Sequence, residues 1–299
     1  AAWVAPTPAA VAAVNEGWIA GFNDPELNRL VAEAIANNRD LMRAAARVEQ
    51  AKALAIMNGA GRYPSVAAKG VSGNTDTEIL SLGATWELDF WGRVRSQARA
   101  AKSQYEASQS DYRWAEQSLA ASVANSWFSL IELSRVIERT QQSITAQEGL
   151  LAKAKQRTKT GISPETDIEE ADSKLRGMRV DLTAMQLART QAAQALEVLL
   201  GRYPADALRT VQDLPRLAPV PVDVPASLLE RRPDMVAAEQ RVAAAFDMKQ
   251  SADAARLPTI SISAAITDIS SDVFFINNAN SPIRGGSLSL LAPLVSGGY

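Results

Sequence analysis

The sequence contains neither cysteine nor histidine. Their absence excludes disulfide bonds, thiolate nucleophiles, imidazole bases and most transition-metal sites. Basic residues are not in excess either, because 31 Lys and Arg stand against 33 Asp and Glu and the net charge is −2. Such a chain offers no broad positive field to nucleic acid. Much enzyme chemistry and nucleic-acid binding are thereby set aside, and no cofactor is predicted.

Aromatic residues and long apolar runs are also scarce. Only 6% of the residues are aromatic although 47% are hydrophobic, and Ala is the commonest apolar type, which favours closely packed helices. The sequence contains no run of about 18 apolar residues, so no transmembrane helix is predicted. Residues 1–14 lack the basic start and apolar core of an uncleaved signal peptide. Contact with a bilayer would therefore need strands or a lipid anchor that is not in the sequence.

Long helical segments dominate the pattern. From Asp24 to about Ala60, apolar residues recur every three or four positions behind an Asp-Pro start, which predicts one helix. The run from Arg93 to Glu148 contains neither Gly nor Pro, and as one helix it would extend roughly 80 Å. Apolar residues along this run and just beyond it recur at the spacings of three, four and seven typical of coiled coils: Tyr112, Leu119, Val123, Trp127, Leu130, Leu133, Ile137, Ile144 and Leu151.

A tight reversal is predicted at residues 160–164. Gly161 can supply a positive φ there, and Ser163 or Thr166 can cap the next helix. Residues 93–160 and 165–200 are thus predicted to form an antiparallel helical hairpin. Prolines then mark an extended connector, and another helix is predicted over residues 226–255.

Four segments are predicted to be strands: 65–72, 79–90, 259–267 and 287–294. In the second, the even positions are apolar, while Glu87 and Asp89 lie on the other face with Ser81, Gly83 and Thr85. This alternation fits an ordinary sheet packed on a core. It also fits membrane-spanning strands of about 9–11 residues, with Trp86, Phe90 and Trp91 in an interfacial belt. Four strands cannot enclose a pore, so a spanning sheet would need strands from other subunits.

An internal repeat begins and is not completed. A shift of 194 residues lays Asp40 on Asp234, Arg47 on Arg241 and Pro64 on Pro258, and a further shift of about a dozen lays Leu82 on Leu288. We divide the chain into an extended segment 1–23, a first repeat 24–201, a Pro-rich connector 202–225 and an incomplete second repeat 226–299. The first repeat would hold a helix, a β-hairpin over 65–90 and a helical hairpin over 91–201. Such an architecture needs more chain or more subunits.

The residues from Trp86 to Arg93, which leave a strand and enter a long helix, read WELDFWGR. They resemble the WELDxxGR signature of the outer-membrane factors of tripartite efflux systems, the TolC/OprM family. Residues 37–41, 228–235 and 293–298 also resemble landmarks of that family, in its order. Together with the repeat, the resemblance covers nearly the whole chain.

The resemblance implies a mainly α fold with a small β part. Members of the family are homotrimers, in which each protomer gives four strands to a twelve-stranded outer-membrane β-barrel and long helical hairpins to a periplasmic α-barrel. It implies location in the outer membrane of a Gram-negative bacterium, contact with outer-membrane lipid, and partnership with a periplasmic adaptor and an inner-membrane RND transporter. The activity implied is a passive exit duct for drugs or other solutes.

Two features depart from the family. Its lipoprotein members begin with an acylated Cys, which is absent here, and the second helical hairpin would follow Tyr299. We therefore expect the chain to be truncated at its C-terminus, so that no gate residue is assigned. The apolar stripe of 226–255, which includes Leu228, Leu229, Met235, Val242 and Phe246, would then lack part of its cover. A fragment of this length should therefore associate readily, be less stable than the full-length chain and form no sealed trimer.

Candidate site residues follow from these patterns. The resemblance implies adaptor contact at the reversal, by Thr160, Gly161, Ile162, Ser163 and Asp167, although a plain helix turn would explain the same residues. Glu87 and Asp89 are predicted to face the pore, or else a solvated sheet face. The side chains predicted to face the membrane are Leu80, Leu82, Trp86, Leu88 and Phe90. Neither a base nor a nucleophile accompanies the two carboxylates, so no catalytic, cofactor or metal site is predicted.

Three classes of function remain open at this point. The leading one is a passive outer-membrane channel for multidrug or solute efflux. The alternative is a soluble helical scaffold or adaptor-like protein without a pore. An enzyme would need a pocket with converging polar groups, and the sequence predicts none.

Overall fold

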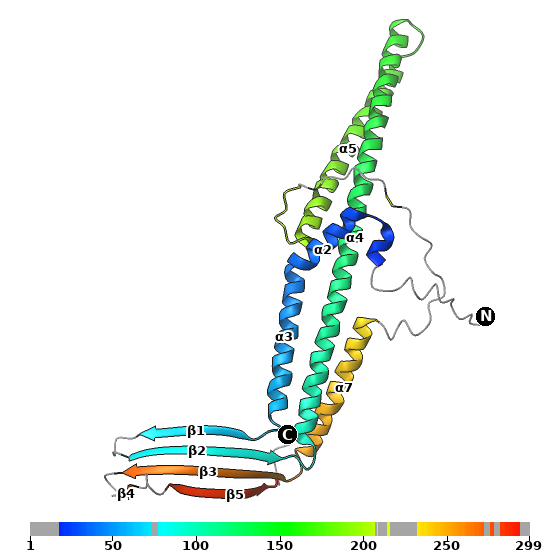
Figure 1. The fold of residues 1–299 in the computed structure, drawn as a ribbon. Helices are drawn as coiled ribbons and strands as arrows, with labels where there is room; N and C mark the ends of the chain where they lie inside the picture. Colours follow the sequence, from blue (N-terminus) through cyan, green and yellow to red (C-terminus); the bar gives the residue numbers. More distant parts are fainter. Residues whose placement is uncertain are drawn as a thin grey trace, which may run out of the picture. The chain divides into compact units, whose positions relative to one another are not determined.

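A computed structural model describes residues 18–72, 77–206, 208, 214–215, 232–271, 276–277 and 282–293 (Figure 1). The chain divides into two compact units, one within residues 1–43 and 114–228 and the other within 44–113 and 229–299. In chain order the elements are η1 Trp18–Phe22, α2 Pro25–Asn37, α3 Arg39–Ala60, β1 Ser65–Ser72, β2 Thr77–Leu88, α4 Arg93–Lys159, α5 Thr166–Leu199, α7 Pro233–Ala254, β3 Thr259–Ser271, β4 Ile276–Asn277 and β5 Ile283–Leu291. The fold is mainly helical, as predicted.

The helix predicted over residues 24–60 is two helices, so that prediction was wrong at Asn38. Asn38 has extended backbone angles between α2 and α3, and its Oδ1 accepts hydrogen bonds from the amides of Asp40 (2.9 Å) and Leu41 (3.0 Å). Its Nδ2 donates to the carbonyl of Leu199 at 3.0 Å. The spacing of buried apolar residues continues across the break, from Ala34 of α2 to Leu41 of α3, which is why the pattern alone did not reveal it.

Helix α2 begins as predicted, at Asp24 with Pro25 in the first turn. One carboxylate oxygen of Asp24 accepts from the amides of Glu26 (3.0 Å) and Leu27 (3.1 Å), and the other accepts from Trp127 Nε1 at 2.8 Å. Asp24 and Trp127 are both buried. This cap therefore also ties α2 to the core of α4, whose buried side chains include Val123, Leu130 and Ile131.

The predicted helical hairpin is confirmed in α4 and α5. Most of the expected seam of α4 is buried, and near the tip Ile144 and Leu151 pack with Leu175 of α5. A side-chain amide crosses the same interface, because Gln147 Nε2 donates to the carbonyl of Ala171 at 3.2 Å. Apolar packing along the seam holds this hairpin together.

The reversal also lies where it was predicted. Gly161 has φ +75°, and the amide of Ile162 bonds back to the carbonyl of Arg157 at 2.9 Å, which closes the end of α4. The capping prediction was wrong. Glu165, not Ser163 or Thr166, occupies the position before α5, and no side-chain hydrogen bond caps that helix.

The strands form one antiparallel sheet. Strand β2 pairs with β1 on one side and with β3 of the second repeat on the other, and β3 also pairs with β5 and with the two-residue β4. The predicted strand 65–72 is confirmed, whereas the last strand spans 283–291 rather than 287–294. Strand β2 ends at Leu88, so Asp89 and Phe90 lie beyond it instead of inside the predicted 79–90.

Helix α7 was predicted to begin near Ala226. The described chain resumes at Arg232 and the helix begins at Pro233; residues 226–231, including Leu228 and Leu229 of the predicted apolar stripe, lie outside the described residues. The other three members of that stripe are exposed: Met235, Val242 and Phe246. Within the described part of the chain, no helix combines the length and apolar character needed to cross a membrane.

Candidate functional site

The sheet has one apolar face. The register pairs Leu80 with Gly70, Leu82 with Ala68 and Trp86 with Ile262, so the even-numbered residues of all four long strands share a face. Many of its large side chains are exposed, including Leu80 (63%), Leu82 (52%), Trp86, Ile262, Ile266, Leu288 and Leu290. Phe90 is exposed beyond the end of β2, and Leu88 is half-buried. An exposed apolar surface of this extent indicates contact with another apolar phase or another chain.

The opposite face carries hydroxyl groups. Ser65 and Thr85 approach to 2.8 Å through their hydroxyl oxygens, and so do Ser263 and Ser287. Thr267 Oγ1 donates to Ser81 Oγ at 3.3 Å between β3 and β2. These odd-numbered residues pair laterally across the strands, and the resulting face suits contact with water.

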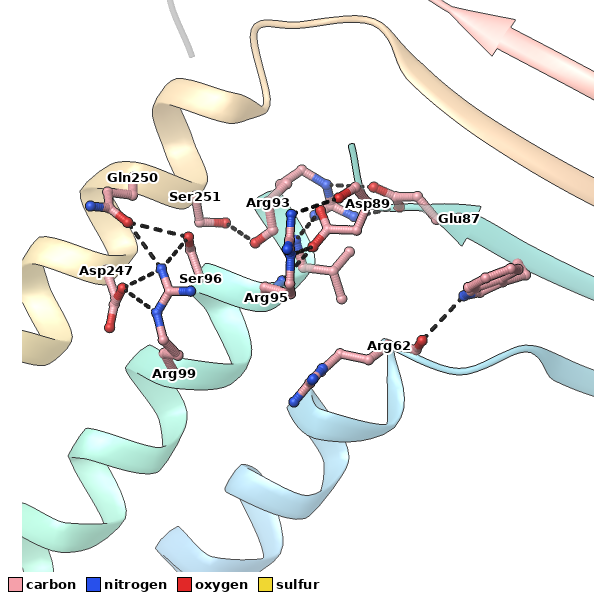
Figure 2. Close-up of polar contacts among 12 residues, drawn as sticks. Arg62, Glu87, Asp89, Arg93, Arg95, Ser96, Arg99, Asp247, Gln250 and Ser251 are labelled. Atoms are coloured by element: carbon pink, nitrogen blue, oxygen red, sulfur yellow. Dashed lines mark hydrogen bonds and ion pairs between the residues drawn. The ribbon is translucent and has the colours of Figure 1, made fainter. Parts of the chain in front are cut away.

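Glu87 stands at the end of this polar face, where β2 leads into α4 (Figure 2). Its carboxylate forms a bidentate pair with Arg93, with Nε to Oε1 at 2.9 Å and Nη2 to Oε2 at 2.6 Å. Hydrogen bonding to Glu87 and the charge of that carboxylate raise the pKa of Arg93 above its ordinary value, although partial burial of Arg93 acts to lower it. The pair bridges the turn between the strand and the helix.

Asp89 caps the long helix from outside it. Its oxygens accept from the amides of Val94 (3.0 Å) and Arg95 (2.8 Å), and Arg95 Nε also donates to Oδ2 at 3.2 Å. Burial acts to raise the pKa of Asp89, but these amide bonds and the Arg95 charge outweigh it and hold the pKa below its ordinary value. A carboxylate at a helix N-terminus is also favoured by the helix dipole.

The same end of α4 is bonded to the second repeat (Figure 2). Arg99 donates from Nε to Asp247 Oδ1 at 2.9 Å and from Nη2 to Gln250 Oε1 at 3.0 Å. Ser251 Oγ donates to the carbonyl of Arg93 at 3.1 Å. The spacing of charges along one helix did not predict these contacts, because each joins residues about 150 positions apart.

The predicted adaptor-contact residues lie together at the reversal. Thr160, Gly161 and Asp167 are exposed, Ser163 is half-buried, and Ile162 has 68% of its surface exposed although it is apolar. Thr160 is held locally, with its hydroxyl bonding to the carbonyls of Gln156 (3.2 Å) and Arg157 (3.0 Å). An exposed Ile at the end of a long hairpin is available to a partner.

Comparison with known proteins assigns a family to this chain. The sequence profile described as outer membrane efflux protein matches residues 30–202 and 224–299. The chain is 32% identical over 287 residues to the probable efflux pump outer membrane protein TtgC of Pseudomonas putida, covering 90% of this chain and 59% of that protein. It is 29% identical over 286 residues to the cation efflux system protein CusC of Escherichia coli K12, covering 89% of this chain and 61% of that one. The chain thus spans about three fifths of the length of these relatives.

Solved structures agree with this assignment. A crystal structure of CusC superposes with a TM-score of 0.86 at 28% identity and covers 95% of this chain and 69% of that chain. The outer-membrane channel OprN superposes with a TM-score of 0.85 at 26% identity and covers 96% of this chain and 70% of that chain. This chain, with its two-faced sheet, its WELDFWGR junction and its long hairpin, therefore belongs to the outer membrane efflux protein family.

Proposed function

We propose that this protein is the outer-membrane exit channel of a tripartite efflux system: a passive conduit that an inner-membrane transporter supplies through a periplasmic adaptor. The observation that carries the proposal is the two-faced sheet. Its exposed apolar face meets lipid, and its hydroxyl face, with Glu87 at the end, meets the water of a pore. Family membership and outer-membrane location support the proposal.

Oligomerisation is part of the proposal. Strands β1 and β5 each have a described partner on one side only, β2 and β3 respectively, and four long strands cannot close around a pore. A trimer would supply twelve strands. The unpaired edges would then bond to neighbouring protomers, which removes the cost of leaving backbone groups unsatisfied in lipid.

Two further roles are proposed for parts of the chain. The tip formed by Thr160, Gly161, Ile162, Ser163 and Asp167 would contact the adaptor, with Ile162 as its apolar anchor. The side chains proposed to face lipid are Leu80, Leu82, Trp86, Leu88 and Phe90. Glu87 and Asp89 are proposed to face the water of the pore.

Conductance tests the function directly. The protein as encoded in its genome, purified from outer membranes and added to a planar bilayer, should give discrete steps of current without nucleotide or a proton gradient. A monomer that stays in water without detergent and gives no steps would support the scaffold alternative instead.

A further inference from the structure

Helices α4 and α7 are joined by a ladder of polar contacts, which we call the α4–α7 ladder. From the sheet outward its rungs are Ser251 to Arg93, Gln250 to Ser96 and Arg99, Asp247 to Arg99, and Arg241 to Asp111. The numbers rise along α4 as they fall along α7, so the two helices run antiparallel. Asp247 keeps only 16% of its side chain exposed, and it forms an ion pair with Arg99 at 2.8 Å.

The internal repeat provides a comparison within the chain. The shift of 194 residues that aligns the repeats places α3 on α7, and it matches Asp247 to Ala53, Gln250 to Ile56 and Ser251 to Met57. None of these three side chains can accept a hydrogen bond from Arg99 in the way that Asp247 and Gln250 do. Only the Arg241 rung has an equivalent, Arg47.

The exposed surfaces of the two helices reflect this difference. Ile56 and Met57 are 66% and 62% exposed, so the face of α3 that corresponds to the ladder is apolar and is not used against α4. If that face were placed against Ser96 and Arg99, their polar groups would be covered without partners. Specificity between similar partners commonly arises from such a penalty on the wrong one.

The junction before the ladder differs between the repeats in the same way. At the further offset that lays Leu82 on Leu288, Glu87 corresponds to Pro293 and Asp89 to Val295. Neither residue can replace the carboxylate that pairs with Arg93 or the one that caps α4. The acidic junction that precedes the ladder is therefore present in the first repeat and is not repeated at Pro293 and Val295 of the second.

We propose that the α4–α7 ladder is a pairing code: it specifies α7 of the second repeat, in one register, as the partner of the junction end of α4. Its central residues are Arg99 and Asp247. They act as positioning residues, because they place α7 against α4 rather than α3, the helix that the repeat makes similar to α7. The proposal does not depend on the proposed transport function.

Because the sequence contains no cysteine, two introduced thiols can report the pairing of α4 and α7 without competition from other thiols. The side chains of Ser96 and Gln250 approach to 3.5 Å, so in a chain with Ser96→Cys and Gln250→Cys a short bismaleimide should cross-link the two thiols when α7 is in register. Adding Asp247→Arg opposes two cations and should lower the cross-linked fraction about fivefold. Combining Arg99→Asp with Asp247→Arg restores opposite charges and should recover most of it.

The matched control is Asp253→Arg. Asp253 is also an acid of α7, but it pairs with Lys249 of the same helix at 2.7 Å, so its reversal should leave cross-linking unchanged. The proposal is overturned if Asp247→Arg cross-links as fully as its parent, or if the charge exchange fails to restore cross-linking in a chain with normal helix content. If Asp247→Arg lowers helix content, Asp247→Ala, which introduces the residue found at the equivalent position 53 and removes the acceptor, takes its place, and undiminished cross-linking would again overturn the proposal.

Discussion

At the scale of single residues, Asn38 joins three helices. Its backbone ends α2, its Oδ1 caps α3, and its Nδ2 satisfies the carbonyl of Leu199 at the end of α5. The side chain is buried, so water cannot replace a lost partner. Asn38→Ala should therefore lower the free energy of unfolding by about 1–3 kcal/mol.

The control for this variant lies on the next helix. Asn58 also donates from Nδ2 to a backbone carbonyl, that of Leu54, but it lies inside α3 and its hydrogen bond is exposed. Asn58→Ala should change the free energy of unfolding by no more than about 0.5 kcal/mol, since Ala favours a helix interior. Denaturant unfolding in detergent, followed by circular dichroism, compares the two, and equal losses would contradict the role given to Asn38.

Asp89 gives the junction a pH dependence. Its pKa in the folded protein is lower than when unfolded, so the stabilisation is present above the unfolded pKa and is lost as the pH falls through the folded pKa. Asp89→Asn should cost about 1 kcal/mol at pH 7 and progressively less below about pH 4. Unfolding curves of both chains from pH 7 to pH 3 check this, and a gap that stays constant over that range would count against the cap.

At the scale of elements, the end of α5 depends on a glycine. Gly201 has φ +75°, and a Cβ added there would lie 2.5 Å from the carbonyl oxygen of Asn37. Gly201→Ala should therefore destabilise the protein by more than the roughly 1 kcal/mol of a left-handed alanine alone, because a backbone atom must move. Gly177→Ala, inside α5 with nothing within 4 Å of the added carbon, should instead stabilise by about 0.5–1 kcal/mol. Thermal unfolding of the two variants should shift in opposite directions.

The faces of β2 predict opposite tolerance to charge. Leu82→Arg would place a cation in lipid and should cost about 2–4 kcal/mol near the bilayer midplane, so little assembled protein should reach the outer membrane. Thr85→Arg, on the hydroxyl face of the same strand, should assemble nearly as well as the parent. The amount of folded oligomer in outer-membrane fractions measures both, and equal yields would argue for a soluble sheet.

At the scale of the whole molecule, the periodic spacing of apolar residues predicted more of the fold than the polar side chains did. The seam of α4, the reversal at Gly161 and the alternation in β2 are properties of neighbouring residues, and the structure confirms them. The Asn38–Leu199 and Arg99–Asp247 contacts join residues 161 and 148 positions apart, and one sequence does not specify such partners. The β2–β3 pairing was hidden for the same reason, although the repeat showed that both strands belong to equivalent units.

The carboxylates of the WELDFWGR segment illustrate this limit. Alternation placed Glu87 and Asp89 together on a polar face, and the prediction that they face a pore concerns other subunits and stays a proposal. Within this chain each carboxylate has a structural partner, Arg93 for Glu87 and the amides of α4 for Asp89. The signature therefore encodes a strand-to-helix junction, and any role in the pore is additional to it.

A cysteine scan of residues 80–88 in protein reconstituted into lipid vesicles tests the central claim most directly, because every introduced thiol is unique. Fluorophores at Leu80, Leu82, Ala84 and Trp86 should be quenched by brominated lipid, and those at Ser81, Gly83 and Thr85 by aqueous iodide. Alternation with a period of two would place the apolar face in lipid and the hydroxyl face in water. Iodide quenching of equal strength at all of these positions would contradict the account.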